Sequence, residues 1–80
     1  MRKEVSARAL LQILKELGFV ELRHTAGHVL IRHRDKKLVV TLPSGNQLVA
    51  PSIVQGILRQ IENFNIESRE ELAKRMERRR

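Results

Sequence analysis

Apolar residues at helical spacing predict an amphipathic helix over residues 6–17. They recur every three or four positions and form one stripe, which is the pattern of a helix that buries one side. Ser6 is placed to cap the first turn with its side-chain oxygen, and Gly18 follows the last turn, where helices commonly end. The predicted stripe consists of Leu10, Ile13, Leu14 and Leu17.

After Gly18 the hydrophobic period shortens to two, which predicts strands. Alternating and β-branched residues favour an extended chain with one buried face. Polar turns, one containing Gly27 and one containing Asp35, separate three such stretches, and residues 43–46 end the last of them. Because the connections are short, we predict an antiparallel meander whose strands cover residues 19–24, 29–34 and 38–42.

A second amphipathic helix is predicted in the segment that follows residue 50. Its start has two possible readings, with Pro51 in the first turn or with Ser52 and Gln55 as a capping box. The sequence does not choose between them. The apolar stripe of this helix consists of Ile53, Val54, Ile57, Leu58 and Ile61.

A third helix is predicted over residues 68–78, because Ser68 and Glu71 have the spacing of a capping box. Its apolar side is thin, which leaves weak docking and docking on a second copy both open: it holds Leu72, Ala73 and Met76. The order helix, three strands, helix predicts one α+β domain. Both of the first two helices then lie on one face of a small antiparallel sheet, and the other face is open to solvent.

Basic residues concentrate in the predicted sheet and indicate a polyanionic partner. The 80-residue chain carries 16 Lys and Arg against nine Asp and Glu, a formal net charge of +7. A small surface with such a charge attracts nucleic acid. Within residues 22–41 a single acidic side chain, Asp35, accompanies five basic ones, which are Arg23, Arg32, Arg34, Lys36 and Lys37.

Composition excludes several classes of function. Without Cys the chain has no disulfide, no thiolate nucleophile and no cysteine-ligated zinc. Phe19 and Phe64 are its only aromatic residues, so a base-stacking platform of aromatic rings is nearly excluded. No apolar run approaches the roughly 20 residues that cross a bilayer. No secretory signal pattern is present either, so we expect a cytoplasmic protein without a membrane partner.

All three histidines lie in the basic stretch and are candidates for chemistry. His33 alternates with Val29 and Ile31, which predicts a buried, structural histidine. His24 ends the first strand, where it either flanks a site or is simply exposed, and a strand-end histidine such as His28 is most often a surface residue. His24 and His28 have a spacing that converges on a helix but not on a strand, so we predict neither a metal site nor a cofactor.

Residues 22–33, which read Leu-Arg-His-Thr-Ala-Gly-His-Val-Leu-Ile-Arg-His, resemble the motif of HicA-type messenger-RNA interferases. In that family a glycine-containing turn delivers a histidine to the start of the second strand. The similarity covers about residues 6–66 and includes Gly18 with Phe19, the Val-Thr-Leu-Pro segment and the second helix. The chain departs from the family pattern at two places. Val29 replaces the second histidine of many members, and a further histidine is often found where this chain has Ser44 and Gly45.

The resemblance implies a double-stranded-RNA-binding-domain-like fold and a toxin that cleaves messenger RNA unless a HicB-like antitoxin silences it. It puts His28 at the catalytic position, where the imidazole would act as general base or acid without metal. Gly27 and the five basic side chains of the predicted sheet are the expected RNA contacts. The match assigns residues 1–66 to the nuclease domain and leaves residues 67–80 as a helical extension, a possible contact of a homodimer.

Two other functions stay open from the sequence. One is a non-catalytic RNA-binding domain of the same fold, which recognises the shape and phosphates of an A-form duplex. The other is a subunit whose exposed sheet edge pairs with another protein. The missing second histidine favours RNA binding alone, whereas the retained pair of Gly27 and His28 favours the nuclease.

Overall fold

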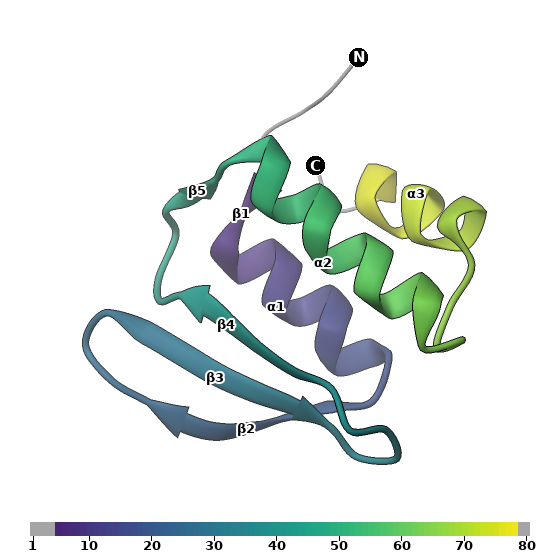
Figure 1. Cartoon of the computed structure of the whole chain (residues 1–80). Helices are drawn as coiled ribbons and strands as arrows, with labels where there is room; N and C mark the ends of the chain where they lie inside the picture. The colour runs from purple at the N-terminus through teal and green to yellow at the C-terminus, as the bar shows by residue number, and fades with distance from the viewer. Residues whose placement is uncertain (1–4, 79–80) are drawn as a thin grey trace.

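The computed structural model describes residues 5–78, so the outermost ends of the predicted ranges 1–66 and 67–80 lie outside the described residues. Two helices lie on one face of a three-stranded antiparallel sheet, and a third packs on the helix layer (Figure 1). The predicted α+β order is therefore confirmed. Its elements are α1 (Ala7–Glu16), β2 (Phe19–His24), β3 (His28–His33), β4 (Val39–Pro43), α2 (Pro51–Asn63) and α3 (Arg69–Arg78).

Two side-chain caps and one proline set the starts of the helices. Ser6 Oγ accepts a hydrogen bond from the backbone N–H of Ala9 at 3.1 Å and begins α1, as predicted. Pro51 is the first residue of α2, and no side chain caps that helix, which decides between the two readings of its start. Ser68 Oγ accepts from the N–H of Glu71 at 3.2 Å and begins α3.

The sheet has the strand order β2-β3-β4, with both pairs antiparallel. His28 pairs with Pro43, so β3 begins one residue earlier and β4 ends one residue later than predicted. A second, two-stranded sheet joins β1 (Val5–Ser6) to β5 (Leu48–Val49). This pair was not predicted, because strands of two residues are too short to show a hydrophobic period.

Alternation along the strands divides the main sheet into a buried face and an open face. On β3, Val29, Ile31 and His33 are buried, whereas His28 and Arg32 are exposed. The catalytic candidate therefore lies on the face that the helices leave free. The buried face and the helices form one aliphatic core, which includes Leu10, Leu14, Phe19, Val29, Ile31, Val40, Leu42, Val54, Leu58 and Ile61.

Helix α3 docks on its own chain through one leucine and one arginine. Leu72 is 0% exposed and belongs to the main core, and Met76 packs partly against it. Arg75 Nε donates to Glu67 Oε2 at 2.9 Å, and Arg75 Nη1 donates to Glu16 Oε1 at 3.0 Å, which links α3 to α1. Of the three apolar residues of this helix, Leu72 and Met76 thus pack within the chain, and Ala73 is exposed.

Gly18, between α1 and β2, is expected to tolerate no side chain. Its φ of 104° lies in the left-handed region, and an added Cβ would meet His33 Nε2 at 3.0 Å. We expect Gly18→Ala to lower the free energy of unfolding by about 1–3 kcal/mol in urea titrations followed by circular dichroism. Gly56 lies inside α2 with nothing within 4 Å of an added Cβ. Gly56→Ala should therefore stabilise the protein by up to about 1 kcal/mol, and equal losses at both positions would contradict this explanation.

Candidate active site and nucleic-acid interface

The turn that precedes His28 is closed by hydrogen bonds of Thr25. The backbone N–H of Thr25 donates to the carbonyl oxygen of His28 at 2.9 Å, and the N–H of His28 donates to Thr25 Oγ1 at 3.1 Å. Ala26 and Gly27 form the tip between them, and an added Cβ on Gly27 would meet nothing within 4 Å. The sequence thus folds into a tight hairpin end that presents His28 at the first position of β3.

Ser44, which follows β4, braces the same turn from the neighbouring strand. Its backbone N–H donates to the carbonyl of Gly27 at 3.1 Å, and its Oγ donates to the carbonyl of Ala26 at 2.8 Å. No local pattern in the sequence predicts this contact, because the serine lies 18 residues from Ala26. Ser44 fixes the backbone on which His28 depends, although it stands where the family often carries a histidine.

Strand register brings two of the predicted RNA contacts to the open face together with His28. Arg23 of β2 pairs with Leu30, and Arg32 of β3 pairs with Val20 on one side and Val39 on the other. Paired residues direct their side chains to the same face of a sheet. Leu30 and Arg32 alternate with the buried residues of β3, so both arginines share the face of His28.

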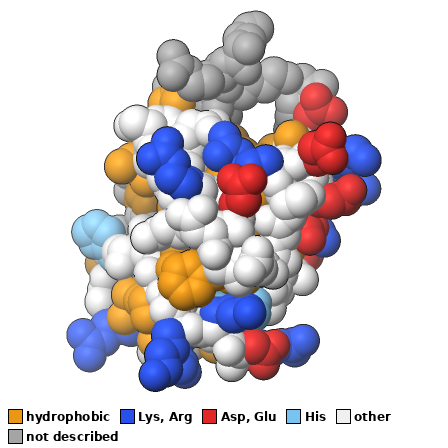
Figure 2. Space-filling view, turned by 45° about the vertical axis from the view of Figure 1, so that its right-hand side comes forward, with side chains coloured by type: hydrophobic (Ala, Val, Ile, Leu, Met, Phe, Trp, Pro, Cys, Tyr) orange, Lys and Arg blue, Asp and Glu red, His pale blue; other side chains and the backbone are white. Residues whose placement is uncertain are grey.

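The other predicted contacts lie at the opposite end of the hairpin. Arg34, Lys36 and Lys37 are exposed in the turn between β3 and β4. Six residues of extended strand separate Arg34 from His28, a distance of about 20 Å. The structure therefore does not bring this basic turn next to His28. Figure 2 shows Lys and Arg side chains around the lower end of the molecule, whereas most acidic side chains gather along its right-hand side.

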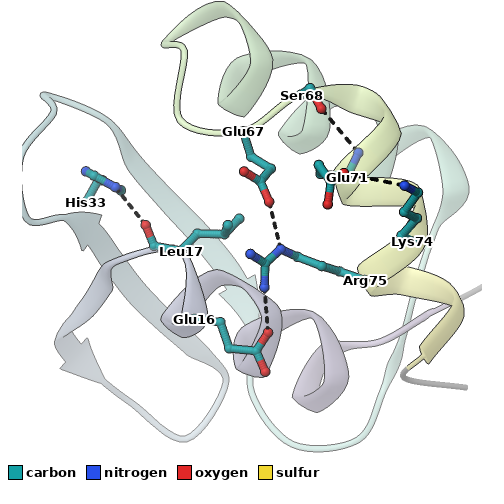
Figure 3. A network of polar contacts seen from close by, with 8 residues as sticks. All are labelled: Glu16, Leu17, His33, Glu67, Ser68, Glu71, Lys74 and Arg75. Carbon is teal, nitrogen blue, oxygen red and sulfur yellow. Dashed lines mark hydrogen bonds and ion pairs between the residues drawn. The ribbon is translucent and has the colours of Figure 1, made fainter.

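His33 is a structural histidine, as predicted. Its side chain is buried, and its ring meets that of Phe19 edge to face at 5.1 Å. The Nδ1 atom accepts hydrogen bonds from the N–H groups of Asp35 at 3.1 Å and Lys36 at 3.2 Å. These two donors leave the ring proton on Nε2, which donates to the carbonyl of Leu17 at 2.8 Å (Figure 3). Every polar atom of the ring is therefore engaged in holding the fold.

His24 and Glu21 form an exposed ionic cluster with Lys15. Lys15 Nζ lies 3.0 Å from Glu21 Oε2, and His24 Nδ1 lies 3.8 Å from Glu21 Oε1. The hydrogen bond from Lys15 lowers the pKa of the Glu21 carboxyl below its ordinary value. Glu21 is then ionised at neutral pH and unsuited to donate a proton. His24 is accounted for by this surface contact.

Residues 5–78 contain neither a candidate metal cluster nor a helix that could span a membrane. No group of three or more His, Asp or Glu side chains is placed there to hold a metal ion. No helix of that part of the chain is long and apolar enough to cross a membrane. His28, on its braced turn, is the candidate for chemistry that the sequence motif indicates.

Comparison with known proteins decides the family. The sequence model of a family described as the HicA toxin of bacterial toxin-antitoxin systems matches residues 7–62, which are 56 of the 80 residues. The chain belongs to the HicA toxin family. No curated protein and no solved structure matched the chain in the same comparisons. The HicA match begins with α1 and ends within α2, so it contains the whole main sheet and leaves α3 outside.

Proposed function

We propose that this HicA-family protein is a messenger-RNA-cleaving toxin that uses His28 and no metal ion. The observation that carries the proposal is the presentation of His28. Its imidazole is exposed at a strand end, on a hairpin fixed by Thr25 and Ser44, within the part of the chain that matches the HicA family. Arg23 lies on the same face and provides positive charge for the phosphate.

The chemistry requires a group that accepts a proton near neutral pH, which is the property of imidazole. His28 takes the proton of a ribose 2′-hydroxyl, and this oxygen attacks the adjacent phosphorus while the bond to the 5′-oxygen breaks. The departing oxygen takes a proton from water, and the hydroxide that forms takes the proton that His28 had accepted. One product then ends in a cyclic phosphate and the other in a 5′-hydroxyl, and no metal takes part.

The experiment is an RNA cleavage assay with the purified chain in excess EDTA, followed by analysis of the product ends. Cleavage that persists and leaves cyclic phosphate ends supports the proposal. Activity that EDTA removes and magnesium restores would replace it with a metal-dependent mechanism. The absence of cleavage despite RNA binding favours the alternative, a non-catalytic RNA-binding domain of the same fold, for which the family's second histidine is not needed.

A HicB-like antitoxin is the partner that the family implies. The net charge of +7 favours a partner with an acidic surface, and the shielding of His28 from RNA is the means of inhibition that we propose. The proposed site of action is the cytoplasm, where messenger RNA is translated. The assignment of residues 1–66 to the nuclease and of residues 67–80 to an extension is part of the same proposal.

RNA binding should weaken steeply with salt, because each phosphate that meets a Lys or Arg releases counterions. We expect Lys37→Gln to reduce the slope of the logarithm of the binding constant against the logarithm of salt concentration by about 0.7–0.9. Lys74→Gln on α3, whose lysine pairs with Glu71, is the matched control and should leave the slope unchanged. Equal effects of the two substitutions would mean that the basic turn does not contact RNA.

A further inference from the structure

The open face of the main sheet repeats one arrangement from His28 to the basic turn. Successive outward positions of β3 are His28, Leu30 and Arg32. Cross-strand pairing extends each into a row, and every row holds at least one polar or cationic side chain beside at least one apolar residue. The rows are His28 with Pro43, then Arg23 with Leu30 and Thr41, then Val20 with Arg32 and Val39.

The charge of this face is uniformly positive or neutral. In the strands that the structure describes, none of the outward positions named above is Asp or Glu. Glu21 pairs with Ile31, so it belongs to the opposite side of the sheet, where Lys15 holds it. A face that carries arginines and no acidic side chain fits a phosphate backbone and is repelled by basic surfaces.

Two large apolar side chains of the Arg32 row and one beside it are exposed, whereas Leu30 and Pro43 of the other rows are partly buried. Val20 is 48% and Val39 is 49% exposed, and Leu22, at the irregularity of β2, is 53% exposed. Large aliphatic side chains next to arginines suit a ligand that has both charged and flat apolar parts. Nucleotides with unpaired bases have this combination, because the faces of the bases are free.

The exposed aliphatic side chains favour a single strand over a duplex, and the spacing of the rows fits one strand. Adjacent rows are two residues apart along β3, about 7 Å, which is similar to the separation of phosphates in an extended single strand. Successive phosphates can therefore meet Arg23 and Arg32 while a base lies on the exposed aliphatic side chains. A duplex hides its base faces, so Val20 and Val39 would meet sugars and phosphates instead.

From this arrangement we propose that the open face binds a single, unpaired RNA strand that runs from His28 along β3 to the turn containing Arg34, Lys36 and Lys37. This proposal rests on the proposed function for the reaction at His28, and it adds the class of substrate and its path. Arg23 and Arg32 hold successive phosphates, and the basic turn holds the end of the segment. Bases contact aliphatic side chains, so the strand is held with little sequence preference.

The test measures binding without cleavage, in the otherwise intact chain carrying His28→Ala. The probes are a fluorescein-labelled oligouridine of about 12 nucleotides and a labelled RNA duplex of equal length, followed by anisotropy. We expect the single strand to bind at least about tenfold more tightly than the duplex. Adding Val39→Glu should weaken the single strand by about tenfold or more, because it places a carboxylate between phosphate contacts.

Ile53→Glu is the matched control for Val39→Glu. Ile53 is 51% exposed against 49% for Val39, and both substitutions change the net charge equally, but Ile53 lies on α2. We expect Ile53→Glu to change single-strand binding by less than about twofold. Circular dichroism on each variant establishes that the fold is retained.

Three results would overturn the proposed path. They are equal binding of the duplex, equal effects of the two glutamates, and a Val39→Glu variant that keeps RNA binding but loses a protein partner. In the second case cleavage by the wild-type chain would still stand, so the nuclease proposal survives. Conversely, tight single-strand binding that depends on Val39 supports the path even where the wild-type chain cuts no RNA.

Discussion

His28→Ala is expected to abolish RNA cleavage, with a rate at least about 100-fold below that of the wild-type chain, since a positioned proton acceptor contributes about that much or more. The fold should persist, because His28 is exposed on the open face and contributes nothing to the core. The free energy of unfolding of the variant should differ from that of the wild-type chain by no more than about 0.5 kcal/mol. The measurement pairs single-turnover cleavage with circular dichroism on the same preparation.

His24→Ala provides the matched control for this prediction. His24 is also exposed, ends the neighbouring strand and takes part in a surface contact with Glu21. We expect its substitution to leave the cleavage rate within about twofold of the wild-type rate. A well-folded His28→Ala variant that cuts RNA at the normal rate would remove His28 from the mechanism.

Leu72→Ala is expected to destabilise the protein by about 2–4 kcal/mol, because truncating a fully buried leucine loses its transfer free energy and leaves a cavity. Leu72 is 0% exposed and is the buried residue of α3, so α3 should detach at lower denaturant than the rest. Urea unfolding followed by circular dichroism measures the loss. Cleavage per folded molecule should not change, since α3 packs on α1 and α2, away from the open face.

The same substitution at Leu48 is the control, because that leucine is 62% exposed. Leu48→Ala should cost less than about 0.5 kcal/mol. If the two substitutions cost the same, α3 does not dock on its own chain in solution. A change in oligomeric state on Leu72→Ala would instead indicate that this helix contacts a second copy.

The hydrophobic period along the sequence predicted most of the fold, because most elements are long enough to show such a period. The stripe of α1 and its cap at Ser6 are confirmed, and the alternation of His33 with Val29 and Ile31 correctly predicts its burial. The docking of α3 depends on single side chains instead, and these show no period. Leu72 is the buried residue by which α3 docks in the core, and a thin apolar side cannot reveal which surface it meets.

The sequence predicted which residue is the candidate for catalysis, but it did not predict the contacts that hold this residue in place. The family motif points to His28, and strand alternation alone puts Arg32 on the same face. The brace from Ser44 joins positions far apart in the chain, and such contacts have no local pattern. Register across three strands also decides that Arg23 faces outward, because the irregularity between Glu21 and Arg23 shifts the alternation of β2.

The buried ring of His33 connects the helix layer to the basic turn. One side of the imidazole holds the end of α1 through Leu17 (Figure 3), and the other holds the N–H groups of Asp35 and Lys36. The turn backbone is therefore ordered before any ligand arrives. A preorganised loop loses less conformational entropy on association than a mobile one, so more of the attraction between its cations and a phosphate chain remains as affinity. A residue without contact to the ligand can in this way set how tightly the ligand is held.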